Sequence, residues 1–169
     1  MAGEDFAGLY RQYLPRVLNY VRLRVGDEAL AQDLTAETFE RAFARRSQLR
    51  DADAFAGWLF RSARNEVAQH FRRQNARGKH LGLDAAFGVP DGDPLPEEEA
   101  VRRQELADLL GAVGGLAERE QEILRLKFVA GLTNRAIGKV LRLREGNVAV
   151  ILYRTMRKLR SRLTSGDQG

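Results

Sequence analysis

The segment 55–73 constrains the fold most, because its apolar residues recur at the spacing of an α-helix. On a helical wheel of about 100° per residue, these side chains fall on one broad arc made of Phe55, Trp58, Leu59, Ala63, Val67 and Phe71. The opposite side carries Arg61, Asn65 and Arg72, with Arg64 beside them. Such a helix can pack on its own domain through one face and present hydrogen-bond donors to an anion through the other. A solvated basic face without a ligand fits the same pattern, and this segment alone does not choose between the two.

Helical spacing also dominates the rest of the chain, which predicts an all-α fold. It occurs in 6–21, where Pro15 predicts a kink or a late helix start, and in 28–46, 97–113, 117–130, 134–141 and 145–163. Residues 78–96 lack this periodicity and hold four glycines and three of the four prolines. We therefore predict two small helical domains, 1–77 and 97–169, joined by a flexible linker over 78–96. The linker is long enough for the two domains to sit far apart.

Two helices of the second predicted domain have apolar faces that we expect to be buried. In 97–113 the face is made of Val101, Leu106, Leu109, Leu110 and Val113. In the last helix it is made of Val148, Leu152, Thr155, Met156, Leu159 and Leu163. Both sets follow the helical repeat, so each predicts a packed side.

Charge is distributed unevenly along the chain. Residues 1–77 carry 13 Lys and Arg against 10 Asp and Glu, residues 78–100 carry 1 against 6, and residues 101–169 carry 14 against 7. Two basic domains that flank an acidic connector indicate a polyanionic partner contacted at two places. Most of the basic residues are Arg, which favours bidentate contacts to phosphates and bases.

Composition argues against several other classes of protein. The chain has no cysteine, which excludes disulfides and thiolate metal sites. No signal-like N-terminus and no apolar run of membrane-spanning length are present, so we expect a soluble cytoplasmic protein. His70 and His80 are the only imidazoles, they have no metal-ligand spacing, and there is no phosphate-binding glycine loop. We therefore expect no enzyme activity, no metal and no cofactor.

The segment 28–46 is unusually polar for a helix, with Asp33 and Glu37 one turn apart and Arg41 four residues after Glu37. An exposed face with a helical Glu37–Arg41 pair explains this pattern, and so does a docking face for another protein. A catalytic carboxylate pair is disfavoured, because nothing nearby supplies a nucleophile, a metal set or a phosphate loop.

The C-terminal part of the chain has the pattern of a helix-turn-helix. Gly131-Leu132-Thr133 closes one helix and caps the short helix 134–141, and a tight break at 142–144 leads into a longer basic helix. Residues 135–169 hold 9 Lys and Arg against 2 Asp and Glu, which favours a nucleic-acid-binding unit over a bare helical hairpin. On the wheel of the last helix, Val150 lies near the middle of the exposed face.

These segments together resemble the extracytoplasmic-function (ECF) sigma factors of bacterial RNA polymerase, over nearly the whole chain. AQDLTAETFERAF (31–43) is similar to the core-binding helix of the family's region two. FAGWLFRSARNEVAQHFRR (55–73) is similar to its promoter-melting helix, and 116–141 followed by EGNVAVILYRTMRKLR (145–160) is similar to region four. The resemblance implies an alternative sigma factor that binds core polymerase and directs promoter recognition and melting.

The resemblance also implies roles for individual residues. The β′ clamp helices of the polymerase would be met by Asp33, Leu34, Glu37 and Phe39, and the β subunit would be a further contact. The minus-ten element would be met by Arg50, Asp51, Ala52, Asp53, Phe55, Trp58, Arg61, Arg64, Asn65, Arg72 and Arg73, with the loop 50–55 capturing a flipped base. The minus-thirty-five element would be met by Arg144, Asn147, Val150, Arg154, Arg157 and Lys158. An anti-sigma factor would be an additional partner.

The chain departs from the family pattern at two places. Leu116 is followed by Ala117, where members of the family usually have proline. The last helix carries Asn147, Ala149, Val150 and Ile151, where Thr, Lys, Ser and Arg are usual. Apolar groups there can pack on thymine methyls or on a protein partner. A stand-alone helix-turn-helix regulator is the alternative function, but it would need neither the Trp58 helix nor the polar helix 28–46.

Overall fold

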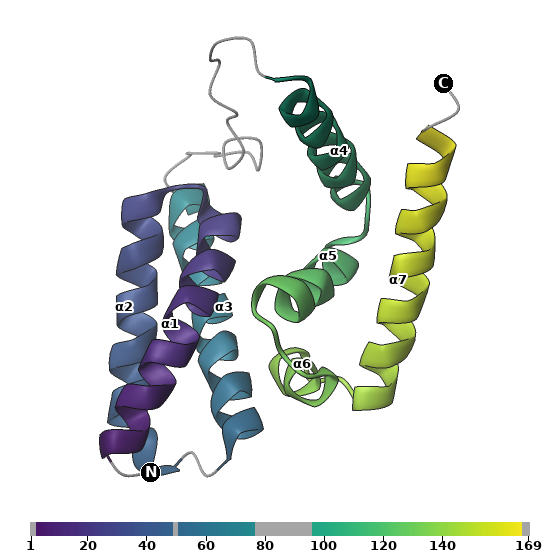
Figure 1. Ribbon diagram of the computed structural model, residues 1–169. Helices are drawn as coiled ribbons and strands as arrows, with labels where there is room; N and C mark the ends of the chain where they lie inside the picture. The colour runs from purple at the N-terminus through teal and green to yellow at the C-terminus, as the bar shows by residue number, and fades with distance from the viewer. Residues whose placement is uncertain (1–2, 49–50, 77–95, 167–169) are drawn as a thin grey trace.

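The computed structural model describes residues 3–48, 51–76 and 96–166 (Figure 1). These residues form helices and contain no strand, so the all-α prediction is confirmed. None of the helices in these ranges is both long enough and apolar enough to cross a membrane. The predicted linker 78–96 lies outside the described residues except for Pro96, which precedes the first helix of the second half.

The first half, called module one here, is a bundle of three helices that lie side by side (Figure 1). They are α1 (Gly3–Val25), α2 (Glu28–Ala44) and α3 (Ala52–Ala76), with a short 3-10 turn η1 (Arg46–Gln48) before α3. Pro15 lies inside the continuous α1, so the predicted late helix start is wrong. The Leu30 amide donates to the Asp27 carboxylate at 2.8 Å, which caps the start of α2.

Aromatic side chains fill the centre of module one. Phe55 and Phe60 of α3 are fully buried, and Phe55 packs on Tyr13 with ring centroids 5.5 Å apart. Tyr20 of α1 is also fully buried and meets Phe60 edge to face at 5.7 Å. The apolar arc predicted for 55–73 therefore faces α1 and α2, although Trp58 and Phe71 at its margins are only half-buried.

The second half, module two, begins with α4 (Glu97–Gly114) and α5 (Glu118–Leu124). A π-helical turn, η3 (Arg125–Val129), extends α5, and then come α6 (Asn134–Leu141) and α7 (Glu145–Gly166). The core of this module is made of buried side chains from α5 to α7, among them Ile123, Leu126, Ile137, Val148, Leu152 and Leu159.

Two predictions about apolar faces in module two need correction. Met156 and Leu163 of α7 are 46% and 38% exposed, because α4 covers only part of that side of the helix. On α4, Val101, Leu106 and Leu109 are exposed, and Leu110 and Val113 are half-buried. Helical periodicity located these stripes correctly, but no element of the described residues covers them fully.

The two modules pack against each other, although the linker length alone allows them to be far apart. Helix α6 of module two crosses α3 of module one (Figure 1), and η3 packs against α1. Gly57 makes the close approach of the helices feasible, since a Cβ there would lie only 2.9 Å from Cβ of Lys139. Part of the surface of α3 that was expected to face a ligand is therefore covered by module two.

Candidate nucleic-acid and polymerase interfaces

Helices α6 and α7 form a helix-turn-helix. Specific hydrogen bonds and one glycine fix the backbone conformation of the turn between them. The Ala136 amide donates to the Thr133 hydroxyl at 3.1 Å and caps α6, as the sequence predicted. Arg142 takes the left-handed conformation with φ 56°, and the Leu143 amide donates to the Gly138 carbonyl at 2.9 Å. A Cβ on Gly138 would lie 2.5 Å from the Leu143 carbonyl oxygen, so this position needs glycine. Sequence reasoning missed Gly138, although a glycine inside such a short helix is a recognisable signal.

The outer face of α7 is open to solvent. Arg144, Asn147, Arg154 and Arg157 are exposed, and Val150 is 47% exposed, near the middle of this face as the wheel predicted. The Arg157 guanidinium lies over the Tyr153 ring at 5.9 Å from its centroid, which holds it beside the aromatic face. These groups leave this face of α7 accessible to an external partner.

Lys158 differs from the other predicted minus-thirty-five residues, because its ammonium group pairs with Glu120 of α5. That hydrogen bond holds the pKa of the Glu120 carboxyl below its ordinary value. The pair ties α7 to α5, so Lys158 contributes to the packing of module two as well as to its positive charge.

On α3 the predicted stripe divides into an open part and a covered part. Asn65, Arg72 and Arg73 are exposed toward the C-terminal end of the helix. Arg61 is half-buried and donates to the backbone carbonyl of Lys139 in α6. The Arg64 guanidinium lies 3.7 Å from the Glu122 carboxylate of α5, but the Arg64 side chain is still 45% exposed. The covered part is nearer the start of the helix, where α6 crosses it.

The loop before α3 also contacts module two. The Asp51 carboxylate accepts from the Ala54 amide at 2.7 Å and lies 3.9 Å from the Lys139 ammonium. The Ala54 hydrogen bond, with Lys139 beside it, holds the pKa of the Asp51 carboxyl below its ordinary value. The Asp53 carboxylate accepts from the Thr133 hydroxyl at 3.2 Å. Ala52 is exposed, and Arg50 lies outside the described residues.

Two aromatic residues predicted to meet the minus-ten element have different environments. Phe55 is fully buried among Phe6 and Tyr13, so it is a core residue. The expectation that Phe55 helps to capture a flipped base is therefore corrected. Trp58 is half-buried, with the Arg45 guanidinium 6.0 Å from its ring centroid. Helical position alone could not separate them, because both fall on the same apolar arc.

The polar face of α2 likewise separates into surface and core. Asp33 and Glu37 are exposed, whereas Leu34 and Phe39 are 7% and 4% exposed and pack inside module one. The expectation that Leu34 and Phe39 contact a partner is therefore corrected, because both side chains are buried in module one and the Phe39 ring packs on Tyr10. Arg41 pairs with the buried Glu66 of α3, so the predicted Glu37–Arg41 pair does not form.

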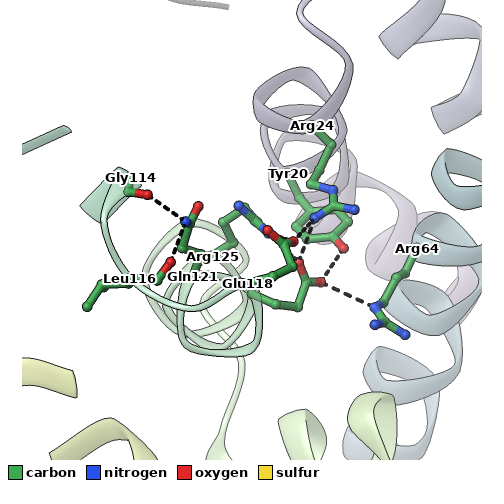
Figure 2. Close-up of polar contacts among 9 residues, drawn as sticks. Tyr20, Arg24, Arg64, Gly114, Leu116, Glu118, Gln121 and Arg125 are labelled. Atoms are coloured by element: carbon green, nitrogen blue, oxygen red, sulfur yellow. Dashed lines mark hydrogen bonds and ion pairs between the residues drawn. The ribbon is translucent and has the colours of Figure 1, made fainter. Parts of the chain in front are cut away.

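A polar cluster around the buried Glu122 joins the two modules, and sequence reasoning missed it entirely (Figure 2). The Tyr20 hydroxyl donates to the Glu122 carboxylate at 2.5 Å, and burial raises the pKa of that hydroxyl far above its ordinary value. Arg24 donates to Glu118 at 2.7 Å and to Glu122 at 3.2 Å. Arg125 donates to the same two carboxylates at 2.6 and 2.9 Å. Glu122 is only 3% exposed, yet the sequence around it reads as an ordinary polar helix.

An apolar groove of about 750 Å³ lies between α4, the α5–η3 segment and α7. Its walls include the half-exposed α4 stripe and the exposed ring of Phe128, and they are lined mainly by Leu109, Leu110, Val113, Leu124, Phe128 and Met156. The groove has an almost entirely apolar lining, so it offers few polar groups to nucleic acid.

Two family models match the chain, Sigma-70 region 2 over residues 9–77 and Sigma-70, region 4 over residues 106–159. The ECF RNA polymerase sigma factor BldN of Streptomyces coelicolor is 36% identical, over 98% of this chain and 63% of its own length. The ECF RNA polymerase sigma factor SigE of Mycolicibacterium smegmatis is 31% identical, over 92% of this chain and 60% of its own length. The chain thus spans less than two thirds of the length of these two relatives.

Solved structures share the fold at low identity. The sigma factor RpoE of Bartonella quintana, solved in complex with the anti-sigma factor NepR, has a TM-score of 0.67 and 19% identity, covering 95% of this chain and 98% of that one. CnrH, solved in complex with the cytosolic domain of CnrY, has a TM-score of 0.63 and 21% identity, covering 97% of this chain and 90% of that one. Both likenesses concern the arrangement of the helices.

Proposed function

The chain belongs to the ECF sigma factors, and from this premise we propose that it binds core RNA polymerase and directs it to promoter DNA for transcription initiation. The observation that carries the proposal is the presence of both sigma regions in one chain, each with its own basic helix. A stand-alone helix-turn-helix regulator would not explain the region-two match over residues 9–77. The proposed role is one of binding and positioning, requires no catalysis by this chain, and implies a cytoplasmic protein.

In this proposal α7 binds the minus-thirty-five element mainly through phosphates. Arg154 and Arg157 are exposed on the same face as Asn147 and Val150, so the two arginines can hold the backbone while the other two side chains meet base edges. Arg144 at the start of the helix adds a further phosphate contact. Base preference is modest, because Val150 offers a thymine-methyl contact and no bidentate hydrogen bond.

In the same proposal α3 meets the minus-ten element. Asn65, Arg72 and Arg73 are exposed along its outer side and would contact the backbone and bases there. Trp58 offers a partly exposed ring on which an unpaired base can stack. Asp51, Ala52, Asp53, Arg61 and Arg64 complete the surface at the start of the helix.

Protein partners would use two further surfaces. The exposed carboxylates of Asp33 and Glu37 on α2 are the residues we assign to the β′ clamp helices. The apolar groove beside α4 is the surface we assign to contacts with the β subunit or with an anti-sigma factor. Both assignments use side chains that module packing leaves accessible.

Purified core RNA polymerase provides the test of this proposal. We expect the chain to co-elute with core enzyme in gel filtration and to confer transcription from a restricted set of promoters. The Asp33→Ala/Glu37→Ala double variant should weaken this association, while its folding stability changes by no more than about 0.5 kcal/mol because both carboxylates are exposed. Glu40→Ala, an exposed acid on the same helix, is the control.

Duplex DNA binding with no association to core polymerase would favour the stand-alone regulator. If the double variant and the parent chain bind core polymerase equally well, Asp33 and Glu37 of α2 do not contact the clamp helices.

A further inference from the structure

We propose that Val150 and Tyr153 of α7 select duplex DNA by the C5-methyl groups of its pyrimidines, which thymine and 5-methylcytosine both present in the major groove. This inference rests on the proposed function and names the chemical group that α7 recognises within its DNA element. Tyr153 is an addition to the residues assigned from the sequence.

The two side chains lie on the outer side of α7. Val150 is 47% exposed and Tyr153 is 65% exposed. They are three residues apart, so they are neighbours on one face of the helix. The core of module two is on the opposite side, where Val148, Leu152 and Thr155 are buried. A partner that lies against the outer side of α7 therefore meets Val150 and Tyr153 directly.

The middle of this face has almost no hydrogen-bonding side-chain atoms. Gly146, Ala149, Val150 and Tyr153 follow the i, i+3, i+4, i+7 spacing of one helix face, and all four are exposed. Their side chains contain a single polar atom, the Tyr153 hydroxyl oxygen. Val150 therefore cannot make the bidentate hydrogen bonds that distinguish guanine or adenine.

The charges around this face favour a polyanion as its occupant. Arg144, Arg154 and Arg157 are exposed, and none of them takes part in an ion pair among the described residues. The Arg157 guanidinium lies beside the Tyr153 ring, 5.9 Å from its centroid. A DNA duplex that covers Val150 would place its phosphates next to these guanidinium groups.

A methyl group is the feature of a base edge that suits an apolar side chain. In the major groove thymine presents a C5-methyl group, whereas the other unmodified bases present hydrogen-bond donors and acceptors. An apolar side chain against such a polar edge displaces water without replacing its hydrogen bonds, which is unfavourable. Against a methyl group it buries apolar surface, which contributes about fourfold in affinity for each methyl group buried.

Deoxyuridine tests this proposal, because it differs from thymidine only by the missing methyl group. The full-length chain first enriches duplexes from a randomised pool, and the enriched duplexes are copied with thymidine or with deoxyuridine. Fluorescence anisotropy should show about fourfold weaker binding of the deoxyuridine copy for one contacted methyl group, and about 15-fold for two. The salt dependence should be the same for both copies, because their phosphates are unchanged.

A third duplex distinguishes the two sources of the methyl group. It carries a 5-methylcytosine–guanine pair at the responsive position and is compared with the same duplex containing cytosine. Tighter binding of the methylated duplex would make 5-methylcytosine a ligand as well. Equal binding of these two duplexes, with discrimination against deoxyuridine retained, would restrict the ligand to thymine.

Variants of the exposed side chains show whether the protein reads the methyl group. Val150→Thr replaces one methyl group by a hydroxyl group at nearly the same shape, and Tyr153→Ala removes the ring. Each should bring the ratio of thymidine to deoxyuridine affinity closer to one, with the circular dichroism spectrum unchanged. Arg154→Ala is the comparison: it should weaken binding to both copies equally and leave this ratio as it is. A ratio that survives in both Val150→Thr and Tyr153→Ala would mean that the methyl group acts through DNA shape, and would overturn the proposal.

The measurements are made on the free chain and on its complex with core polymerase, which separates this proposal from the proposed function. Equal binding of thymidine and deoxyuridine copies by the parent chain in both states would overturn the methyl proposal alone. If Val150→Thr then also weakens association with core polymerase, the exposed valine serves a protein interface. If the free chain discriminates between the copies but never binds core polymerase, the proposed function fails while methyl recognition stands.

Discussion

Helices α3 and α7 are both basic and are both proposed to face promoter DNA, yet they differ in how much of that face is accessible. On α7 the exposed side from Arg144 to Arg157 is open to solvent along its length. On α3 the half near Arg72 is open, whereas Arg61 and Arg64 contact module two. The difference shows that a basic stripe in a sequence marks a capacity to bind anions, and that tertiary packing decides whether an external anion can use it.

The largest effect should come from Phe55, the buried aromatic at the covered end of α3. Phe55→Ala should lower the free energy of unfolding by about 3–5 kcal/mol, because it removes a ring packed among Phe6 and Tyr13. Chemical denaturation followed by circular dichroism measures this, with Ala52→Gly at the exposed start of α3 as a mild comparison. If Phe55→Ala leaves the stability unchanged but abolishes promoter melting, Phe55 contacts DNA and is not a core residue. The difference in accessibility between α3 and α7 would then be smaller than the structure indicates.

The orientation of α7 depends on the turn that precedes it. The close backbone contact in this turn is possible because residue 138 is glycine. Gly138→Ala should cost about 1–3 kcal/mol of stability, because its Cβ would collide with the Leu143 carbonyl oxygen at 2.5 Å. Gly146→Ala in the first turn of α7 is the matched control, since its Cβ would meet nothing within 4 Å. If the two variants unfold at the same denaturant concentration, the turn is more adaptable than its geometry indicates.

The contrast between the helices is tested most directly by one arginine from each. In the free chain, Arg154→Ala should weaken duplex binding at all sequences and reduce the salt slope by about one unit, because it removes one exposed phosphate contact. Arg64→Ala should weaken duplex binding of the free chain less than Arg154→Ala does, because the Arg64 guanidinium, although its side chain is 45% exposed, lies 3.7 Å from the Glu122 carboxylate. Fluorescence anisotropy over a range of salt concentrations measures both.

With core polymerase present, Arg64→Ala should reduce open-complex formation. If Arg64→Ala weakens DNA binding of the free chain as much as Arg154→Ala does, the two faces are equally accessible and the comparison fails.

The smallest effect should come from Val150 in the middle of the open face of α7. Val150→Ala should change binding by about 1 kcal/mol or less, and only at promoter variants that alter a thymine, because a methyl contact is weaker than a bidentate hydrogen bond. A panel of single-base promoter variants measures this selectivity. Unchanged DNA binding with loss of a bound protein partner would instead mean that this exposed valine serves a protein interface.

The sequence by itself determined the helices, the helix-turn-helix and the family. Helical periodicity, the Thr133 cap and the glycine and proline positions are local signals, since they act over a few residues along the chain. They located α2, α3, α6 and α7 and the open face around Val150. They also brought together the motifs on which the resemblance to the ECF sigma factors depends.

Only the tertiary structure decided which side of each helix is covered. Leu34, Phe39 and Phe55 are in the core rather than at a partner surface, and Arg41 pairs with Glu66 rather than with its helical neighbour. The Tyr20–Glu122 hydrogen bond joins residues 102 positions apart, so no local pattern could indicate it. A helix has several faces and local spacing fixes only their positions. Their use depends on the side chains of distant segments that pack against them, as α6 does on the half of α3 that carries Arg61.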